Sequence, residues 1–281
     1  MTTTFPAIPD SPEFTITRDA LHAYSRILGD WAAHCRPPRK HWWHGSLRLV
    51  LHGLSTGVIC HSVDFQLALD VRDSQFRVQT SNGSCLVQSL HGQSPAGLAE
   101  AARNFLGANG IAPEDMPSPW EDAAHTQTYA EFVPEHAQTI GCVWRAVLTA
   151  LERLRNELRE ETSPLQLWPH HFDLSPLWLP GELLPDQDPD NEEYADKQMN
   201  FGFTLGDAGI AQPYFYVTAY PLPDAQPVTP LPDGSYWHTS SFTGAALLYK
   251  TLLQQDDPQA YLLKLWRIMV RAGREHLLNR N

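Results

Sequence analysis

The residues with the clearest chemical potential lie in two aromatic clusters that contain histidine. One is the KHWWH segment at 40–44, and the other is the WPHHFD segment at 168–173. If residues 165–173 form one extended strand, the two-residue period places His171 and Asp173 on the same face. A histidine beside a carboxylate can act as a general base with its orienting group, or as two ligands of a metal ion.

The same pair also has a purely structural interpretation. A hydrogen bond between His171 and Asp173 inside an aromatic core would satisfy both groups, and perturbed pairs of this kind are often only structural. Adjacent side chains on a strand point to opposite faces, so His170 and His171 cannot easily share one metal ion. The sequence leaves the catalytic, metal-binding and structural interpretations open, and the cofactor is unknown.

A third pattern is the segment PYFYVTAY, in which polar and apolar residues alternate. Tyr214, Tyr216 and Thr218 would share one face of a strand, while Phe215 and Val217 share the other. Tyrosine combines an apolar ring with a polar hydroxyl, so a row of phenols suits the wall of a ligand pocket. The β propensity of these residues explains a half-exposed sheet face equally well.

Several familiar motifs are matched only in part or are absent from the sequence. The GLSTG segment at 53–57 matches a nucleophile elbow, but an alternating strand follows it instead of a helix, so a tight turn between strands is expected. The acidic run that begins at Asp186 lacks the glycine and glutamate that a calcium loop needs at its sixth and twelfth positions. The chain has no dinucleotide-binding glycine motif, P-loop, HExxH or CxxC pair. Nicotinamide and ATP use in their usual forms are therefore unsupported.

Composition limits the class of protein. The chain has 281 residues, 42% of them hydrophobic, and a formal net charge of −12. This composition is typical of a globular protein with its own core, and the acidic balance argues against nucleic-acid binding. The first basic residue is Arg18 and no apolar run is long enough for a membrane span. The cysteines are dispersed, as is typical of reduced thiols in a cytoplasm. We therefore expect a cytoplasmic protein that binds neither membrane nor nucleic acid.

Helices and antiparallel strands should position these residues in the first half of the chain. Residues 1–16 lack periodicity and are expected to be extended, and Thr17 should cap a helix over 18–34. A second helix is expected to begin at Ser94, and a long one to cover 135–161. Strands connected as a meander are expected at 46–53, 62–70, 75–80 and 85–90.

The last third of the chain repeats the order of helix, strands and helix. An acidic loop is expected over 181–198, and helices over 243–254 and after Asp257. Strands are expected at 165–173, 199–205, 213–220 and 236–239. The predicted fold is therefore α+β, with two antiparallel sheet regions packed by helices and a degenerate duplication of one unit as an option. After a lead-in over 1–16, we predict a single domain over 17–281, with sub-halves 17–134 and 135–281.

Taken in order, these segments resemble a bacterial family known only as a domain of unknown function. The segments that carry the resemblance are HWW, GLST, WPHHFDL, the Gly206-Asp207 pair and PYFY. The resemblance extends from about Leu21 to Gly273 and implies one conserved unit, but no reaction. Many relatives carry Gly-Ser where this chain has two histidines at 170–171, so a metal site there would belong to a subgroup.

Motifs that lie far apart in the sequence and are shared within one family suggest convergence in space. We therefore predict a protein that binds a small molecule, with His171 and Asp173 as candidate catalytic or metal-binding residues. Alternatives are a non-catalytic interaction or scaffold protein and a metal-assisted or general-base hydrolase. The oligomeric state is left open. The predicted ligand-binding residues are Trp43, His44, Trp168, Asp207, Tyr214 and Tyr216.

Overall fold

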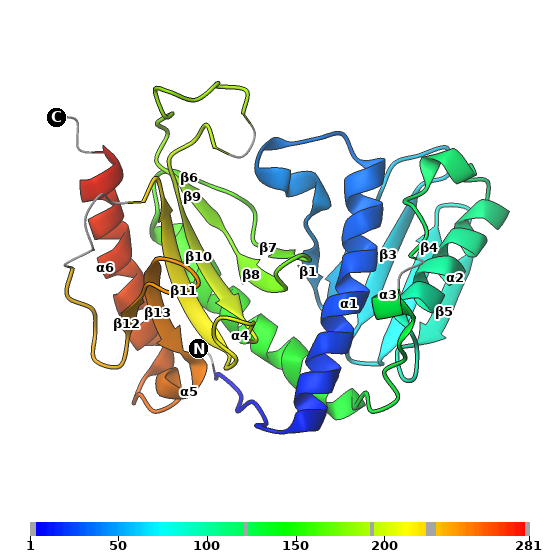
Figure 1. The fold of residues 1–281 in the computed structure, drawn as a ribbon, viewed down its shortest axis with the longest axis horizontal. Coiled ribbons are helices and arrows are strands. Elements are labelled where there is room, and N and C mark those ends of the chain that lie inside the picture. Colours follow the sequence, from blue (N-terminus) through cyan, green and yellow to red (C-terminus); the bar gives the residue numbers. More distant parts are fainter. Residues whose placement is uncertain (1–3, 121–122, 192–193, 223–228, 279–281) are drawn as a thin grey trace. The chain divides into compact units, whose positions relative to one another are not determined.

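A computed structural model describes residues 4–120, 123–191, 194–222 and 229–278 of the chain (Figure 1). The chain divides into two compact units. Unit 1 comprises Met1–Ala7, Arg145–Leu165 and Asp173–Asn281, and unit 2 comprises Ile8–Trp144 and Gln166–Phe172. The long helix α4 (Pro134–Glu157) contributes residues to both.

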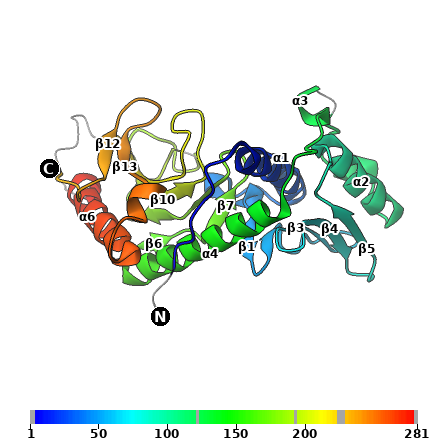
Figure 2. The ribbon, with the colours of Figure 1, turned by 90° about the horizontal axis from the view of Figure 1, so that it is seen from below.

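Unit 2 is built on a five-stranded antiparallel meander in the order β1-β2-β3-β4-β5. Alternating apolar residues of the central strands, such as Phe65, Leu67 and Phe76, are buried. Helices α1 (Pro12–Cys35) and α2 (Pro95–Ala108) lie on one face of this sheet (Figure 2). The strands are Arg48–Val50, Gly53–Ser55, Phe65–Asp70, Gln75–Thr80 and Cys85–Ser89.

Short elements complete unit 2. They are the 3-10 helices η1 (Lys40–Gly45) and η2 (Pro113–Asp115), the helix α3 (Ala123–Thr126) and the strand β7 (Gln166–Trp168). A bridge between Leu47 and Leu167 pairs the start of the meander with β7.

Two boundaries in unit 2 correct the sequence analysis. Helix α1 begins at Pro12, because the hydroxyl of Ser11 accepts the amide N–H of Phe14 at 3.2 Å, so residues 12–16 are helical and Thr17 is not the cap. The expected strand over 46–53 is a hairpin of β1 and β2. Gly53 belongs to β2, where a Cβ would lie 2.0 Å from the carbonyl oxygen of Leu69. This glycine therefore allows close strand pairing and is not part of a turn.

Unit 1 is built on a second antiparallel sheet, in which β12, β13, β11, β10 and β8 follow in that order. Strand β9 also pairs with β10, and β6 with β9. Helix α6 (Pro258–Leu278) contacts β10 and β11, and Phe215 of β11 meets Trp266 of α6 edge to face. The strands of this unit are β6 (Glu161–Thr162), β8 (Asp173–Ser175), β9 (Leu177–Leu179), β10 (Gln198–Thr204), β11 (Tyr214–Tyr220), β12 (Tyr236–His238) and β13 (Gly244–Leu248).

The helix expected over 243–254 is wrong for most of its length. Gly244–Leu248 is β13, and only Tyr249–Leu252 forms the short helix α5. A Cβ at position 244 would lie 2.3 Å from the carbonyl oxygen of Val217, so the glycine permits the close pairing of β13 with β11. The alanines and leucines that follow have good helix propensity, but strand pairing overrides it.

The class is α+β, as the sequence predicts: helices accompany two antiparallel sheets. In the part of the chain that the structure describes, no helix combines the length and apolar character needed to cross a membrane.

Candidate functional site

The candidate site lies on one face of the unit 1 sheet, where β11 presents its tyrosines. Phe215 and Val217 are buried on the side of α6, and Tyr214 and Tyr216 occupy the opposite face, as the alternation predicts. Tyr214 is buried, whereas Tyr216 is only partly buried. The phenols therefore project from the sheet on the face opposite to the helix.

Tyr216 begins a chain of polar contacts across three strands. Its hydroxyl donates a hydrogen bond to Oδ2 of Asp173 on β8, and the side chain of Asp173 is buried. The amide of Asn200 on β10 donates to the Tyr216 hydroxyl at 3.3 Å, and the Ser175 hydroxyl donates to Oδ1 of Asn200. A buried carboxylate, a phenol, an amide and a hydroxyl thus form one connected network.

Gly202 makes this network possible. It pairs directly with Tyr216 across β10 and β11, and a Cβ at this position would lie 2.1 Å from the tyrosine ring. The missing side chain lets the phenol lie across β10 and reach Asp173 on the next strand. The sequence analysis missed Gly202 and Asn200, although a glycine inside a strand signals close approach of another group.

A second phenol–carboxylate pair lies one step along β11. The hydroxyl of Tyr214 donates to Oδ2 of Asp207 at 2.5 Å. The other carboxylate oxygen accepts the backbone N–H groups of Gly209 and Ile210 at 2.7 and 2.9 Å. Asp207 therefore fixes the turn that precedes β11 and presents its charge beside the tyrosine.

An aromatic residue that the sequence analysis missed, Phe242, packs against both tyrosines. The ring of Phe242 is parallel to that of Tyr214, with centroids 6.1 Å apart, and it lies 6.0 Å from the ring of Tyr216. On its other side, the His238 ring stacks on Phe242 at 4.4 Å. Phe242 lies in an irregular segment, so no periodic pattern could have identified it.

The pKa of each phenol is raised above the ordinary value of a tyrosine, so both hydroxyls stay protonated at neutral pH. Burial is the main cause that raises the pKa of Tyr214, followed by its hydrogen bond to Asp207. Burial also raises the pKa of Tyr216, and the negative charge of Asp173 adds to the effect. Each tyrosine is therefore a fixed neutral donor to a carboxylate. The site brings together two carboxylates, with His238 stacked on Phe242 at its edge. Its residues are Asp173, Ser175, Asn200, Asp207, Tyr214, Tyr216, His238 and Phe242.

The WPHHFD segment corrects the prediction of one strand over 165–173. Strand β7 ends at Trp168, residues 169–172 form a turn, and β8 begins at Asp173. The turn is closed by a 2.8 Å hydrogen bond from the N–H of Phe172 to the carbonyl of Trp168, and Phe172 has a φ of 55°. The two-residue period therefore does not connect His171 with Asp173. His171 is exposed in the turn, and Asp173 contacts Tyr216 instead.

The other predicted residues lie in unit 2. Trp43 is half-buried, and Nδ1 of the buried His44 accepts the N–H of Arg39 at 3.1 Å. Trp168 is half-buried in β7. The structure thus groups Asp173, Asp207, Tyr214 and Tyr216 in unit 1, and places Trp43, His44, Trp168 and His171 in unit 2.

Within unit 2, the two histidine-containing motifs do meet. The Ser46 hydroxyl donates to Oε1 of Gln166 at 2.6 Å. A Cβ on Gly29 of α1 would lie 2.5 Å from the ring of Pro169 and 3.6 Å from the carbonyl oxygen of Gly45. The helix, η1 and the turn at 169–172 therefore pack together around this glycine.

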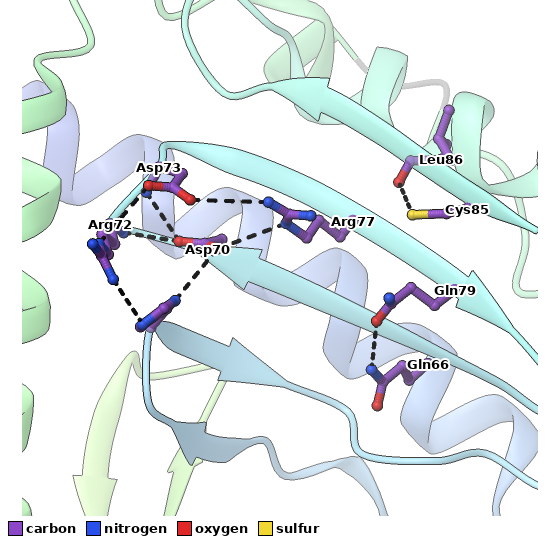
Figure 3. Close-up of polar contacts among 9 residues, drawn as sticks. Gln66, Asp70, Arg72, Asp73, Arg77, Gln79, Cys85 and Leu86 are labelled. Carbon is purple, nitrogen blue, oxygen red and sulfur yellow. Dashed lines mark hydrogen bonds and ion pairs between the residues drawn. The ribbon is translucent and has the colours of Figure 1, made fainter.

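Unit 2 also contains a charged network, at the turn between β3 and β4 (Figure 3). Asp70 lies 3.7 Å from Arg77 and 3.9 Å from the ring of His52, and its Oδ1 accepts the N–H groups of Arg72 and Asp73. Asp73 in turn lies 4.0 Å from both arginines. Each of the two carboxylates therefore faces at least one arginine of the same network.

The arrangement of potential metal-binding side chains does not identify a cofactor. Among the residues that the structure describes, no group of three or more His, Cys, Asp or Glu side chains could hold a metal ion. His171 and Asp173 remain the only candidates that the sequence analysis named for such a role.

Comparison with known proteins identifies the family. The model of a family described as "Family of unknown function (DUF5996)" matches residues 5–276. The chain belongs to this family. The resemblance to a family of unknown function is thereby confirmed over nearly the whole chain, and DUF5996 brings no reaction with it. No curated protein and no solved structure matches the chain.

Proposed function

We propose that unit 1 binds a small organic cation, such as a primary amine, on the tyrosine-bearing face of its sheet. The observation that carries the proposal is that Asp173 and Asp207 each receive a hydrogen bond from a neutral phenol. A phenol satisfies one oxygen of a carboxylate but leaves its negative charge in place. An ammonium group would supply the opposite charge at this face.

Burial makes that charge more effective. The side chain of Asp173 is only 5% exposed, and charges interact more strongly where water is excluded. A cationic ligand that pairs with it therefore gains more than it would from an exposed carboxylate.

The aromatic rings support the same class of ligand. Phe242 and Tyr214 lie parallel, and Tyr216 adds a third ring to the cluster. Aromatic faces attract cations by about 0.5–2 kcal/mol, depending on how far the cation is desolvated. Tyr216 and His238 are partly exposed, so this part of the face is not wholly enclosed by the protein.

The test compares butylammonium with its neutral counterpart butanol by isothermal titration calorimetry. We expect the amine to bind wild-type protein and the alcohol to bind much more weakly. Asp207→Asn should weaken amine binding, because the substitution removes one charge and keeps the size of the side chain. Tyr220→Phe is the matched control, because Tyr220 is on the same strand but outside the network, and it should bind like wild type.

Equal binding of amine and alcohol, or amine binding that Asp207→Asn does not weaken, would contradict the proposal. A protein that binds neither compound would favour the scaffold alternative. The hydrolase alternative needs a separate test, in which His171→Ala is compared with wild type for bound metal by elemental analysis. Metal retained by wild-type protein and lost from this variant would favour the hydrolase instead.

A further inference from the structure

Basic side chains are concentrated in one segment of unit 2. Residues 31–63 contain no aspartate or glutamate, although the chain as a whole has a formal charge of −12. The segment contains Arg36, Arg39, Lys40 and Arg48. It forms the end of α1, η1 and the hairpin of β1 and β2.

Two arginines of this segment, Arg36 and Arg48, lie close enough for their charges to interact. Arg36 donates to the carbonyl oxygens of His44 and Thr56. Burial lowers the pKa of Arg36, and the positive charge of Arg48 lowers it further. No ion pair among the described residues includes Arg36, Arg39 or Arg48. This differs from Arg72 and Arg77 in Figure 3, which face Asp70 and Asp73.

The same segment carries an exposed tryptophan. The side chain of Trp42 is 59% exposed, and its ring stacks on the buried His44 at 5.4 Å. Trp42 and the preceding His41 have φ values of 57° and 54°, which residues other than glycine rarely adopt. Such a conformation persists only where the surroundings enforce it, and it is typical of binding surfaces. Leu51 and Val58 of the same segment are also largely exposed.

This combination fits a protein partner with acidic and apolar side chains. Tryptophan and arginine are the residues most enriched among the energetic centres of protein interfaces. A guanidinium group also matches the geometry of a carboxylate, with which it can form two parallel hydrogen bonds. The exposed aliphatic side chains favour a protein over a nucleic acid, whose recognition relies on aromatic stacking and phosphate contacts.

The chain itself carries a matching segment in unit 1. Asp186, Asp188 and Asp190 are exposed, and no ion pair among the described residues includes them. Leu183 and Tyr194, at either side of them, are 46% and 45% exposed. The segment therefore has the acidic and apolar character that the basic surface requires.

We propose that Arg36, Arg39, Trp42 and Arg48 form a docking surface for residues 183–191 of a second copy of this chain. Each copy carries both surfaces, so every copy can offer either side of the contact to another copy. The net negative charge of the copies opposes association, but at physiological salt it is screened beyond about 8 Å. The opposite charges at the contact are closer than this and act almost unscreened.

Charge reversal tests the pairing directly. We expect wild-type protein to dimerise in sedimentation velocity runs at physiological salt. Arg39→Glu/Arg48→Glu and Asp186→Lys/Asp188→Lys should each weaken self-association by at least about tenfold, because each variant places like charges in contact. An equimolar mixture of the two variants should restore a heterodimer, which native mass spectrometry distinguishes by mass.

Two further variants separate this effect from misfolding and from general charge. Trp42→Ala should weaken dimerisation without lowering the melting temperature, because the side chain is exposed. Arg271→Glu is the control, since it changes an exposed arginine of α6 and should leave dimerisation intact. A wild-type protein that stays monomeric at all concentrations would overturn the proposal. So would a mixture that fails to restore the heterodimer, or a surface that binds single-stranded nucleic acid instead.

Discussion

Asp70 in unit 2 and Asp173 in unit 1 are both largely buried carboxylates, but they are held by different partners. Asp70 faces Arg77 and His52, and two backbone N–H groups donate to it. Asp173 receives the hydroxyl of Tyr216. The first carboxylate lies beside the Arg77 guanidinium and the His52 ring. The hydrogen bond described for the second comes from a neutral donor.

Charged and neutral partners of a carboxylate contribute differently to stability. Exposed ion pairs contribute little, typically 0–1 kcal/mol, because water and salt already screen their charges. A neutral donor to a buried carboxylate contributes more, because losing it leaves a desolvated group without that partner. The phenols of β11 therefore contribute to the stability of the sheet, and under the proposed function they would also contact the ligand.

The largest effect is expected from Gly202→Ala. The new Cβ would overlap the ring of Tyr216 and push the phenol away from Asp173. We expect a loss of about 1–3 kcal/mol in the free energy of unfolding, measured by urea denaturation. In a Tyr216→Ala background, Gly202→Ala should lower the free energy of unfolding by less than it does in wild type, because the ring that the new Cβ would overlap is absent. Additive effects would contradict the proposed clash.

Tyr216→Phe removes one hydroxyl and sharpens the comparison. The substitution leaves Asp173 without the phenol and should lower the free energy of unfolding by about 1–2 kcal/mol at neutral pH. Tyr220→Phe on the same strand is the control and should change stability by less than half as much. Thermal unfolding of both variants followed by circular dichroism measures the difference; equal losses would argue against a special role for the pair.

Alkaline pH provides a third test. The pKa of Tyr214 is raised in the folded protein, chiefly by burial and then by Asp207, so the unfolded state loses its phenolic proton first. The stability that this residue contributes is complete below about pH 10 and is lost as the pH rises above that value. In Tyr214→Phe, the alkaline fall in the free energy of unfolding should be shallower than in wild type. Urea denaturation at a series of alkaline pH values measures both slopes, and identical slopes would contradict the assignment.

The smallest effect is expected from Arg77→Gln in the charged network of unit 2. The guanidinium is partly exposed, so the loss should be about 0.5 kcal/mol and should shrink in high salt. Tyr216→Phe should show little dependence on salt, because its hydrogen bond joins a neutral donor to a buried acceptor. If the salt dependence of the two variants is reversed, the contrast between the networks is wrong.

Local patterns predict the elements of this protein where alternation and turn chemistry agree. Strands β3 and β4 follow unbroken alternation, and the Asn82-Gly83 turn joins β4 to β5. The sequence also carries a signal for the start of α1, a serine N-cap at Ser11 followed by Pro12. The neighbouring prolines made an extended segment the expected structure there, so this signal was not used. Strand β13 could not be predicted in this way, because its pairing with β11 depends on the space at Gly244.

The site was partly predictable for the same reason. Alternation places Tyr214 and Tyr216 on one face, and the family motifs include Asp173 and Asp207. Which carboxylate meets which phenol depends on strand register and on Gly202, and neither is visible in local sequence. The period-two argument for the His171–Asp173 pair fails because the strand ends at Trp168.

The turn at 169–172 has a consequence for protein engineering. Pro169 packs against Gly29 of α1, and Phe172 is held between the rings of His22 and Trp144. These anchors bracket positions 170 and 171, whose side chains are exposed. The backbone carbonyl of His170 contacts the His22 ring of α1 at 3.2 Å, and any residue would supply that carbonyl. The His170 ring also acts through its charge on Asp30 of α1, whose pKa burial raises and this charge lowers. Reporter groups or short binding peptides grafted at these two positions should therefore be displayed by a rigid support.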